Sequence, residues 1–197
     1  KKLVLEYFNS INNANSENLI DTITKYTSSD FKMRCTHPFN ELSGAEEIAN
    51  NLWVPIKNSF EPIQRRMDIF YAGINSLDDH EGKWVTSMGH LMGVFNKSFF
   101  GIQPNYKSIL LRYAEFYKVE NNKITEGAIF LDIMNFMQQL GLSVIPESTG
   151  LVCITPGPMN HRGLKYEHSN NVESQKTLEL IHRMRDRLVK GSNMKSY

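Results

Sequence analysis

Hydrophobic and polar positions follow a helical period in the first third of the chain. Apolar residues recur every three or four positions over residues 1–29 and again from Ile48 to Ile56, where Pro55 is expected to kink the helix. Between these two stretches, residues 31–37 form a short β-like run. The pattern therefore predicts N-terminal helices with one short strand among them.

The middle of the chain changes to a period of two, which is typical of strands. Residues that alternate in this way are joined by short polar turns, and a helix ending near Gly141 follows Asp132. Helices first and strands afterwards favour an α+β domain, with the helices packed on one face of a curved antiparallel sheet. The four strands predicted for this sheet cover residues 63–75, 84–96, 108–119 and 124–132.

The last part of the chain has a different composition, so we predict three regions. Residues 1–142 are the α+β domain, and residues 143–169, rich in proline and without periodicity, are an extended arm or linker. Residues 170–197 form an amphipathic helix without a core of its own. This helix is expected to pack on the domain, on a second copy of the chain, or on a part of the protein beyond Tyr197; its apolar face comprises Leu180, Ile181, Met184 and Leu188.

Charge and composition narrow the kinds of partner. The chain has 22 basic and 21 acidic residues and a net charge of +1, so no electrostatic argument favours nucleic acid or an anionic membrane. No apolar stretch is long enough to span a bilayer, and no secretory signal is evident, so a cytoplasmic location is expected. Cys35 and Cys153 are expected as reduced thiols rather than as a long-range disulfide. Neither the cysteines nor the histidines have metal-ligand spacing, so we expect no metal.

Polar residues interrupt both faces of the predicted strands. Along residues 108–119, Arg112 shares one face with apolar neighbours, and Glu115 shares the opposite face with others. His90 and Asp132 have similar settings on their strands. Buried polar groups must be paired or line a wet pocket, so these four residues are candidates for a site.

Several segments between Leu42 and Leu142 resemble the SnoaL-like polyketide cyclases of the nuclear transport factor 2-like superfamily. The family pattern ends in a strand, an Asp, and a helix that closes with Gln-Leu-Gly. The segments that carry the resemblance are ELSGAEEIANNLWVPIKNSF, WVTSMGHLMGVF, FFGIQP and KITEGAIFLDIMNFMQQLGL. Their order and spacing are more specific than any one of them.

The resemblance implies an α+β conical barrel with a pocket between the curved sheet and the N-terminal helices. It also implies cofactor-free chemistry on a small carbonyl compound, with Asp132 as the acid/base group. A carboxylate at the mouth of an apolar pocket has a raised pKa, which suits proton abstraction next to a carbonyl. The alternative is that Asp132 only caps the following helix. Family members place a histidine where this chain has Leu91, and His90 reaches the pocket only if a β-bulge intervenes.

The remaining candidates are assigned to substrate binding. His90 or Tyr71 would polarise the carbonyl, and Glu115 or Arg112 would tune Asp132. The substrate-binding set is Trp53, Tyr71, Met88, Arg112, Glu115 and Phe130. A pocket for a planar ligand could be lined by Trp53, Trp84, Tyr71 and Tyr113, for which core packing is the alternative. Arg65 and Arg66, together with Arg34, are weaker candidates for an anionic substrate, because consecutive residues of a strand point to opposite faces.

Three functions stay open at this point. The first is a cyclase, isomerase or lyase that works without a cofactor, and the second is a binding module with the same pocket and no turnover. The third is a domain whose exposed face serves assembly. We expect a homodimer, and the C-terminal helix also resembles the first helix of a second cone, as in tandem members of the family.

Overall fold

The structure is a computed structural model that describes residues 1–76, 80–142, 146, 157–168 and 170–192. It consists of two compact units, Lys1–Leu164 and Lys165–Tyr197. Each unit is described by itself below.

The helices of the first unit precede its long strands and present an apolar stripe to the core. In the first helix the buried residues are Val4, Tyr7, Phe8 and Ile11, which have the three- and four-residue spacing of one helix face. The helical segments are α1 (Lys2–Asn13), α2 (Leu19–Tyr26), α3 (Gly44–Ile48), η1 (Ala49–Trp53) and α4 (Val54–Ser59).

A π-helical turn lies just before Pro55, the position at which the sequence predicted a kink. The turn, η1, runs up to Trp53, and Pro55 lies in the first turn of α4. Proline has no backbone N–H and its ring crowds the carbonyl four residues earlier, so a regular α-helix cannot continue through it. Single π-helical turns of this kind are frequent at functional sites.

Six strands form one mixed sheet in the order β2-β1-β6-β5-β4-β3. The meander of β3 to β6 is antiparallel, as predicted. β1 pairs in parallel with β6, and β2 pairs with β1, neither of which the sequence predicted. The strands are β1 (Thr27–Cys35), β2 (Glu41–Ser43), β3 (Gln64–Asn75), β4 (Gly82–Val94), β5 (Ser108–Glu120) and β6 (Lys123–Leu131).

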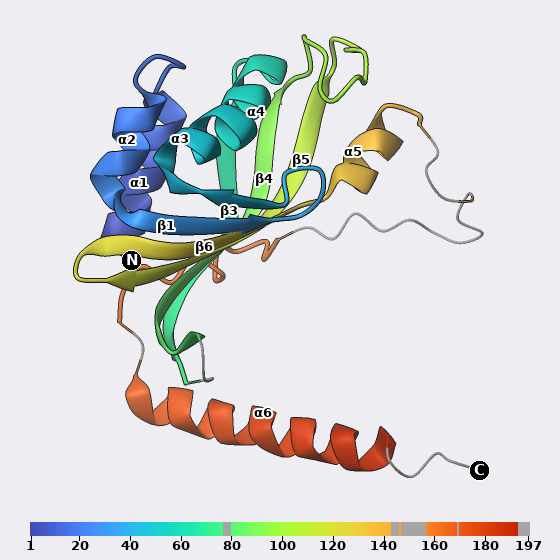
Figure 1. The fold of residues 1–197 in the computed structure, drawn as a ribbon. Coiled ribbons are helices and arrows are strands. Elements are labelled where there is room, and N and C mark those ends of the chain that lie inside the picture. The colour runs from blue at the N-terminus through green and yellow to red at the C-terminus, as the bar shows by residue number, and fades with distance from the viewer. Residues whose placement is uncertain (77–79, 143–145, 147–156, 169, 193–197) are drawn as a thin grey trace. The chain divides into compact units, whose positions relative to one another are not determined.

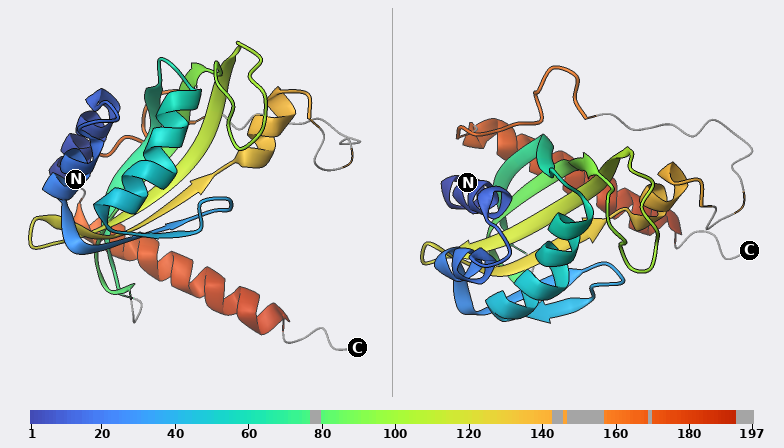
Figure 2. Two further views of the ribbon diagram at one scale, coloured as in Figure 1. Left: turned by 45° about the horizontal axis from the view of Figure 1, so that its top comes forward. Right: turned by 90° about the horizontal axis from the view of Figure 1, so that it is seen from above.

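Helices α1 to α4 cover one face of this curved, unclosed sheet, and we call that face the inner face (Figures 1 and 2). Strand β5 shows how the sequence defines it, since its odd-numbered residues from Ile109 to Tyr117 are buried and the residues between them are partly or fully exposed. The opposite side is the outer face. The predicted α+β class, with helices on one face of a curved sheet, is confirmed.

Two further segments belong to the first unit, and one helix belongs to the second. Helix α5 (Ile133–Gln139) follows β6, and the backbone of residues 157–164 lies along the edge of β3, where Phe70 N donates to Gly163 O at 2.8 Å. The second unit contains helix α6 (Asn171–Ser192). Its large apolar residues are between 47% and 71% exposed, and no helix among the described residues is long and apolar enough to cross a membrane.

Candidate functional site

A buried ion pair lies on the inner face of the sheet. Arg65 Nη1 of β3 donates to Glu115 Oε2 of β5 at 2.7 Å, and their side chains are 2% and 0% exposed. Strand β4 runs between them and has the small residues Ser87 and Gly89 on this face. The small side chain of Ser87, which is paired with Glu115, leaves room for the arginine to cross β4. Gly89 lies against the backbone of β3, where a Cβ would come within 2.0 Å of Arg66 O.

Aromatic rings enclose the guanidinium of Arg65. Its Cζ lies 4.2 Å from the ring centre of Phe8, 4.7 Å from that of Tyr113 and 5.5 Å from that of Trp53. Such contacts stabilise a cation most strongly where water is excluded. Trp53 comes from the π-helical turn, so the irregular helix places an indole over the ion pair.

Several buried polar atoms around this pair have no hydrogen-bond partner among the described residues. Burial without a partner costs about 1–3 kcal/mol for each such group, so native proteins have few of them. Here six of the eight such atoms among the described residues belong to this one place: Tyr7 Oη, Trp53 Nε1, Arg65 Nε, Arg65 Nη2, Glu115 Oε1 and Tyr117 Oη. We name this set, together with Tyr113, the inner cluster.

Burial alters the acid–base properties of the inner cluster. It raises the pKa of Glu115, and the Arg65 guanidinium and the nearby Tyr117 oppose that rise. Burial also raises the pKa values of the three phenols of the inner cluster, those of Tyr7, Tyr113 and Tyr117. The phenols therefore stay protonated at neutral pH and act as hydrogen-bond donors. The carboxylate, meanwhile, becomes a stronger base than an exposed glutamate.

Asp132 has a different environment, because it lies at the end of β6 on the outer face. Its Oδ1 accepts a hydrogen bond from Asn135 N at 2.9 Å and so caps α5, and its Oδ2 accepts from Arg112 Nε at 3.2 Å. The side chain is 28% exposed. Partial burial alone would raise the pKa of Asp132, but Arg112 and the Asn135 amide outweigh it and lower the pKa. The raised pKa that the sequence predicted for Asp132 is therefore wrong.

His90 also lies on the outer face. Its Nδ1 is 3.2 Å from Asp68 Oδ2, and its strand pairs it with Arg66 on one side and Arg112 on the other. The bulge that would have turned His90 inward is instead in β3, between Met67 and Ile69. The face of His90 is therefore the one given by simple alternation along β4.

The sheet separates the other predicted site residues in the same way. Trp53 and Glu115 lie inside, next to Arg65, whereas the rest are on the outer face, partly or fully exposed: Tyr71, Met88, Arg112 and Phe130. Arg65 and Tyr113 were only weak candidates, and Tyr7 and Tyr117 were not assigned to the site. Alternation along β5 would have found Tyr117, since it shares a face with Glu115.

The described residues offer no ready metal site. They contain no group of three or more His, Cys, Asp or Glu side chains arranged to hold a metal ion. Cys35 is a free thiol whose pKa burial raises to about 12, while Cys153 lies outside the described residues.

Comparison with protein families finds a match over residues 78–140, to the model of the SnoaL-like polyketide cyclases. The predicted resemblance to this family is confirmed. The matched region spans less than half of the chain, and it contains β4, β5, β6 and α5, including both Glu115 and Asp132. A comparison with curated protein sequences finds no match.

Solved structures share the fold of this chain at low sequence identity. IdmH from Streptomyces antibioticus, proposed to be a polyketide cyclase, is 13% identical with a TM-score of 0.57, covering 72% of this chain and 97% of IdmH. AclR from Streptomyces galilaeus, proposed to be a hydroxylase, is 16% identical with a TM-score of 0.57, covering 94% of each chain. A protein with a ketosteroid isomerase-like fold from Catenulispora acidiphila, in complex with trimethylamine, is 14% identical with a TM-score of 0.50, covering 72% of this chain and 93% of that one.

Proposed function

We propose that this chain is a cofactor-free acid/base enzyme of the cyclase or isomerase type, which transfers a proton on a small carbonyl compound inside the cone. The observation that supports it is the inner cluster, where a carboxylate of raised pKa lies beside three neutral phenols. Two of these phenols, Tyr7 and Tyr117, make no well-formed hydrogen bond among the described residues. The SnoaL-like region and the ketosteroid isomerase-like fold are in keeping with this class of reaction.

The inner cluster offers a group for each part of such a reaction. Glu115 takes the proton next to the carbonyl, and Arg65 holds the carboxylate in place through its hydrogen bond. Phenol groups such as that of Tyr117 donate hydrogen bonds to the oxygen on which negative charge develops. The protonated Glu115 then returns the proton to a different carbon, which completes an isomerisation.

Glu115 therefore replaces Asp132 as our candidate base. Asp132 is matched to the acid/base position of the family, but here its two carboxylate oxygens are engaged by Arg112 and by the amide of Asn135. A lowered pKa makes it a weaker base than an ordinary aspartate. Capping of α5 is the role that these contacts support.

A binding module without turnover is the second candidate. The side chains that enclose the ion pair, among them Phe8, Trp53 and Tyr113, are at most 2% exposed. A ligand reaches Glu115 only after some of these rings move. A protein that binds tightly and turns over slowly fits such a closed interior as well as an enzyme does. Homodimer formation and a cytoplasmic location stay predictions in both cases.

Proton exchange on simple ketones tests the enzymatic proposal. In deuterium oxide, the wild-type chain should catalyse exchange of the α-protons of cyclohexanone or acetophenone for deuterium. The loss of the α-proton signal in the proton NMR spectrum measures the rate. Glu115→Gln should slow this exchange by at least about 100-fold, the usual contribution of a general base. Because Glu115→Gln leaves Arg65 buried without its counter-ion, the double variant Arg65→Met/Glu115→Leu serves as a second, uncharged test of the same loss.

Two results would contradict the proposal. One is a wild-type chain that exchanges neither ketone above the buffer rate. The other is a folded Glu115→Gln or double variant that exchanges as fast as the wild type. Ligand binding by the wild type without exchange would instead favour the binding module.

A further inference from the structure

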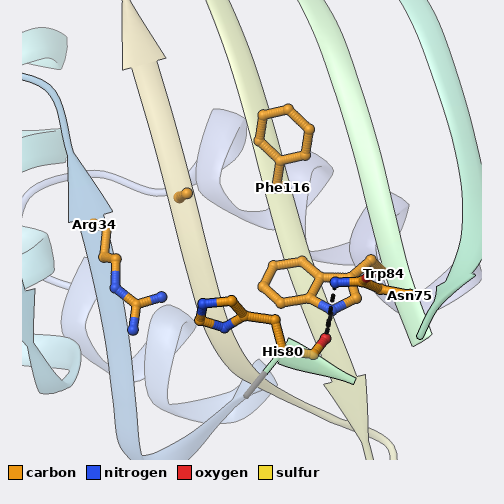
Figure 3. A pocket seen from close by; sticks show the side chains of 6 residues that line it. Arg34, Asn75, His80, Trp84 and Phe116 are labelled. Carbon is orange, nitrogen blue, oxygen red and sulfur yellow. Dashed lines mark hydrogen bonds between the residues drawn. The ribbon is translucent and has the colours of Figure 1, made fainter. Parts of the chain in front are cut away.

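A hollow lies on the outer face of the sheet, away from the inner cluster. Its volume is about 330 Å³, at the small end of the range for ligand pockets. Figure 3 shows the side chains that line it. The lining residues are Arg34, Asn75, His80, Trp84, Phe116 and Ala128.

Register and residue size explain why the sheet is hollowed here. Arg34 of β1, Ala128 of β6 and Phe116 of β5 are direct neighbours across three strands. Only a methyl group separates the arginine from the phenyl ring, so the floor of the hollow is low at its centre. Trp84 pairs with Gly73, which adds no side chain beside the indole.

Hydrogen bonds hold the aromatic wall in place. Trp84 Nε1 donates to His80 O at 2.8 Å, and Asn75 Nδ2 donates to the same oxygen at 3.1 Å (Figure 3). The rings of His80 and Trp84 meet edge to face, with their centres 6.4 Å apart. A wall fixed in this way loses little conformational freedom when a ligand binds.

Basic groups stand at one side of the hollow and share one carboxylate. Glu126 lies 3.2 Å from Lys118 Nζ, 3.4 Å from Arg34 Nη1 and 3.7 Å from His80 Nδ1. Among the described residues, the side chain of Arg34 makes a single hydrogen bond, the one to Glu126, and this side chain is 51% exposed. Most of the five N–H groups of the guanidinium therefore face water.

A second, wider hollow of about 640 Å³ adjoins the first and shares Arg34 and His80 with it. Its other lining residues are all polar: Asp30, Lys32, Glu120, Thr125 and Glu126. Arg34 and His80 thus mark the boundary between an apolar hollow and a polar one. A ligand with an apolar end and a charged end has one favourable orientation across this boundary.

We infer that the outer hollow binds a small planar aromatic molecule with one anionic group, such as an aryl carboxylate. The ring packs against Trp84 and Phe116, which give offset or edge-to-face contacts with an aromatic partner. The anion accepts hydrogen bonds from Arg34 and His80, and a carboxylate matches the fork of the guanidinium. This site is independent of the inner cluster and of the proposed reaction.

Naphthoate is a suitable probe, and naphthamide is its neutral counterpart. The chain has two tryptophans, so its NMR spectrum has two indole N–H signals, which Trp84→Phe assigns. Naphthoate should shift the Trp84 signal and leave the Trp53 signal unchanged, with a Kd on the order of 0.1–1 mM. Naphthamide should bind at least about fivefold more weakly, because it lacks the charge-assisted hydrogen bonds.

Three variants distinguish binding at this site from nonspecific binding. Arg34→Gln should weaken naphthoate binding about fivefold to tenfold and leave naphthamide binding unchanged. Ala128→Leu should fill the floor and weaken both probes by more than about tenfold. Arg66→Gln is the matched control, since Arg66 is an exposed arginine of the outer face that does not line the hollow, and it should bind both probes as the wild type does.

The inference is overturned if naphthoate leaves the Trp84 signal in place at millimolar concentration. It is also overturned if Arg34→Gln and Ala128→Leu, both folded, bind naphthoate as tightly as the wild type. A shift confined to the Trp53 signal would assign the probe to the inner cluster, which contradicts the outer site and leaves the proposed function intact.

Discussion

Two arginine–carboxylate pairs lie on opposite faces of the same sheet, and strand β5 contributes to both. On the inner face, Glu115 pairs with Arg65, and both side chains are almost fully buried. On the outer face, Arg112 pairs with Asp132, and the side chains are 44% and 28% exposed. Burial raises the pKa of Glu115, whereas the arginine and an amide lower the pKa of Asp132. The same kind of ion pair therefore holds a stronger base, Glu115, on the inner face and a capping carboxylate that is ionised at neutral pH, Asp132, on the outer face.

The largest expected difference between the two pairs is in stability. Glu115→Ala leaves a buried guanidinium without its counter-ion and should lower the free energy of unfolding by about 3–5 kcal/mol. The double variant Arg65→Met/Glu115→Leu should recover most of that loss, because well-packed apolar side chains replace a buried pair at little cost. Urea unfolding followed by circular dichroism measures both. If the single variant is as stable as the wild type, the pair is not the buried structural unit described above.

The outer pair should cost less to remove, and most of its contribution should be capping. Asp132→Ala should lower the free energy of unfolding by about 1–2 kcal/mol, through loss of the cap of α5 and of a partly solvated ion pair. Asp132→Asn keeps a good capping residue and should lose less than about 1 kcal/mol. Equal losses for the two substitutions would mean that the ion pair, and not the cap, dominates.

Removing one hydroxyl from the inner cluster should stabilise the fold and impair its activity. Tyr117→Phe deletes a buried hydroxyl whose contact with Glu115 falls short of a well-formed hydrogen bond, so the free energy of unfolding should rise by up to about 1 kcal/mol. Ketone proton exchange should fall by about 100-fold if this hydroxyl stabilises the oxyanion. Tyr26→Phe is the control, because the hydroxyl of Tyr26 is 2.9 Å from Ser10 Oγ, and its loss should destabilise the fold without affecting exchange. A stability gain without a loss of exchange would remove Tyr117 from the proposed machinery.

The opposite pKa directions give opposite pH dependences. Asp132 has an ordinary pKa of 3.8 and a lower one in the fold, so the stability it contributes is present above pH 3.8 and is lost as the pH falls through the folded value. Glu115 has an ordinary pKa of 4.5 and a higher one in the fold, so its contribution is present below pH 4.5 and is lost as the pH rises through the folded value. In urea unfolding across this range, Asp132→Asn should remove part of the acid-induced loss of stability. A wild-type and an Asp132→Asn curve that stay parallel below pH 3.8 would contradict the ion pair.

The sequence predicted the α+β class well because the relevant patterns are local. A helical period in the first third and an alternating one in the middle are enough to predict helices packed on one face of a meander. The parallel pairing of β1 with β6 is a contact between distant segments, and no local pattern encodes it. The π-helical turn before Pro55 likewise depends on how the helix packs, which a proline alone does not determine.

The site was harder to predict, and the reason lies in the alternation of strands. Arg112 and Glu115 were assigned to one site although their positions on β5 differ by an odd number, which places them on opposite faces. Asp132 was predicted as the acid/base group because it matches the family pattern, whereas Arg65 and the three tyrosines of the inner cluster belong to no short motif. They come together only because β3, β5 and the helices α1 and η1 all contribute side chains to the inner face, where the small Ser87 of β4 is paired with Glu115.

The assignment of Glu115 as the base is best tested by measuring ketone proton exchange by Glu115→Gln beside that by Asp132→Asn. Asp132→Asn should exchange within about threefold of the wild type, whereas Glu115→Gln should lose at least about 100-fold. An inactive Asp132→Asn with an active Glu115→Gln would show that Asp132 on the outer face, and not Glu115, is the base.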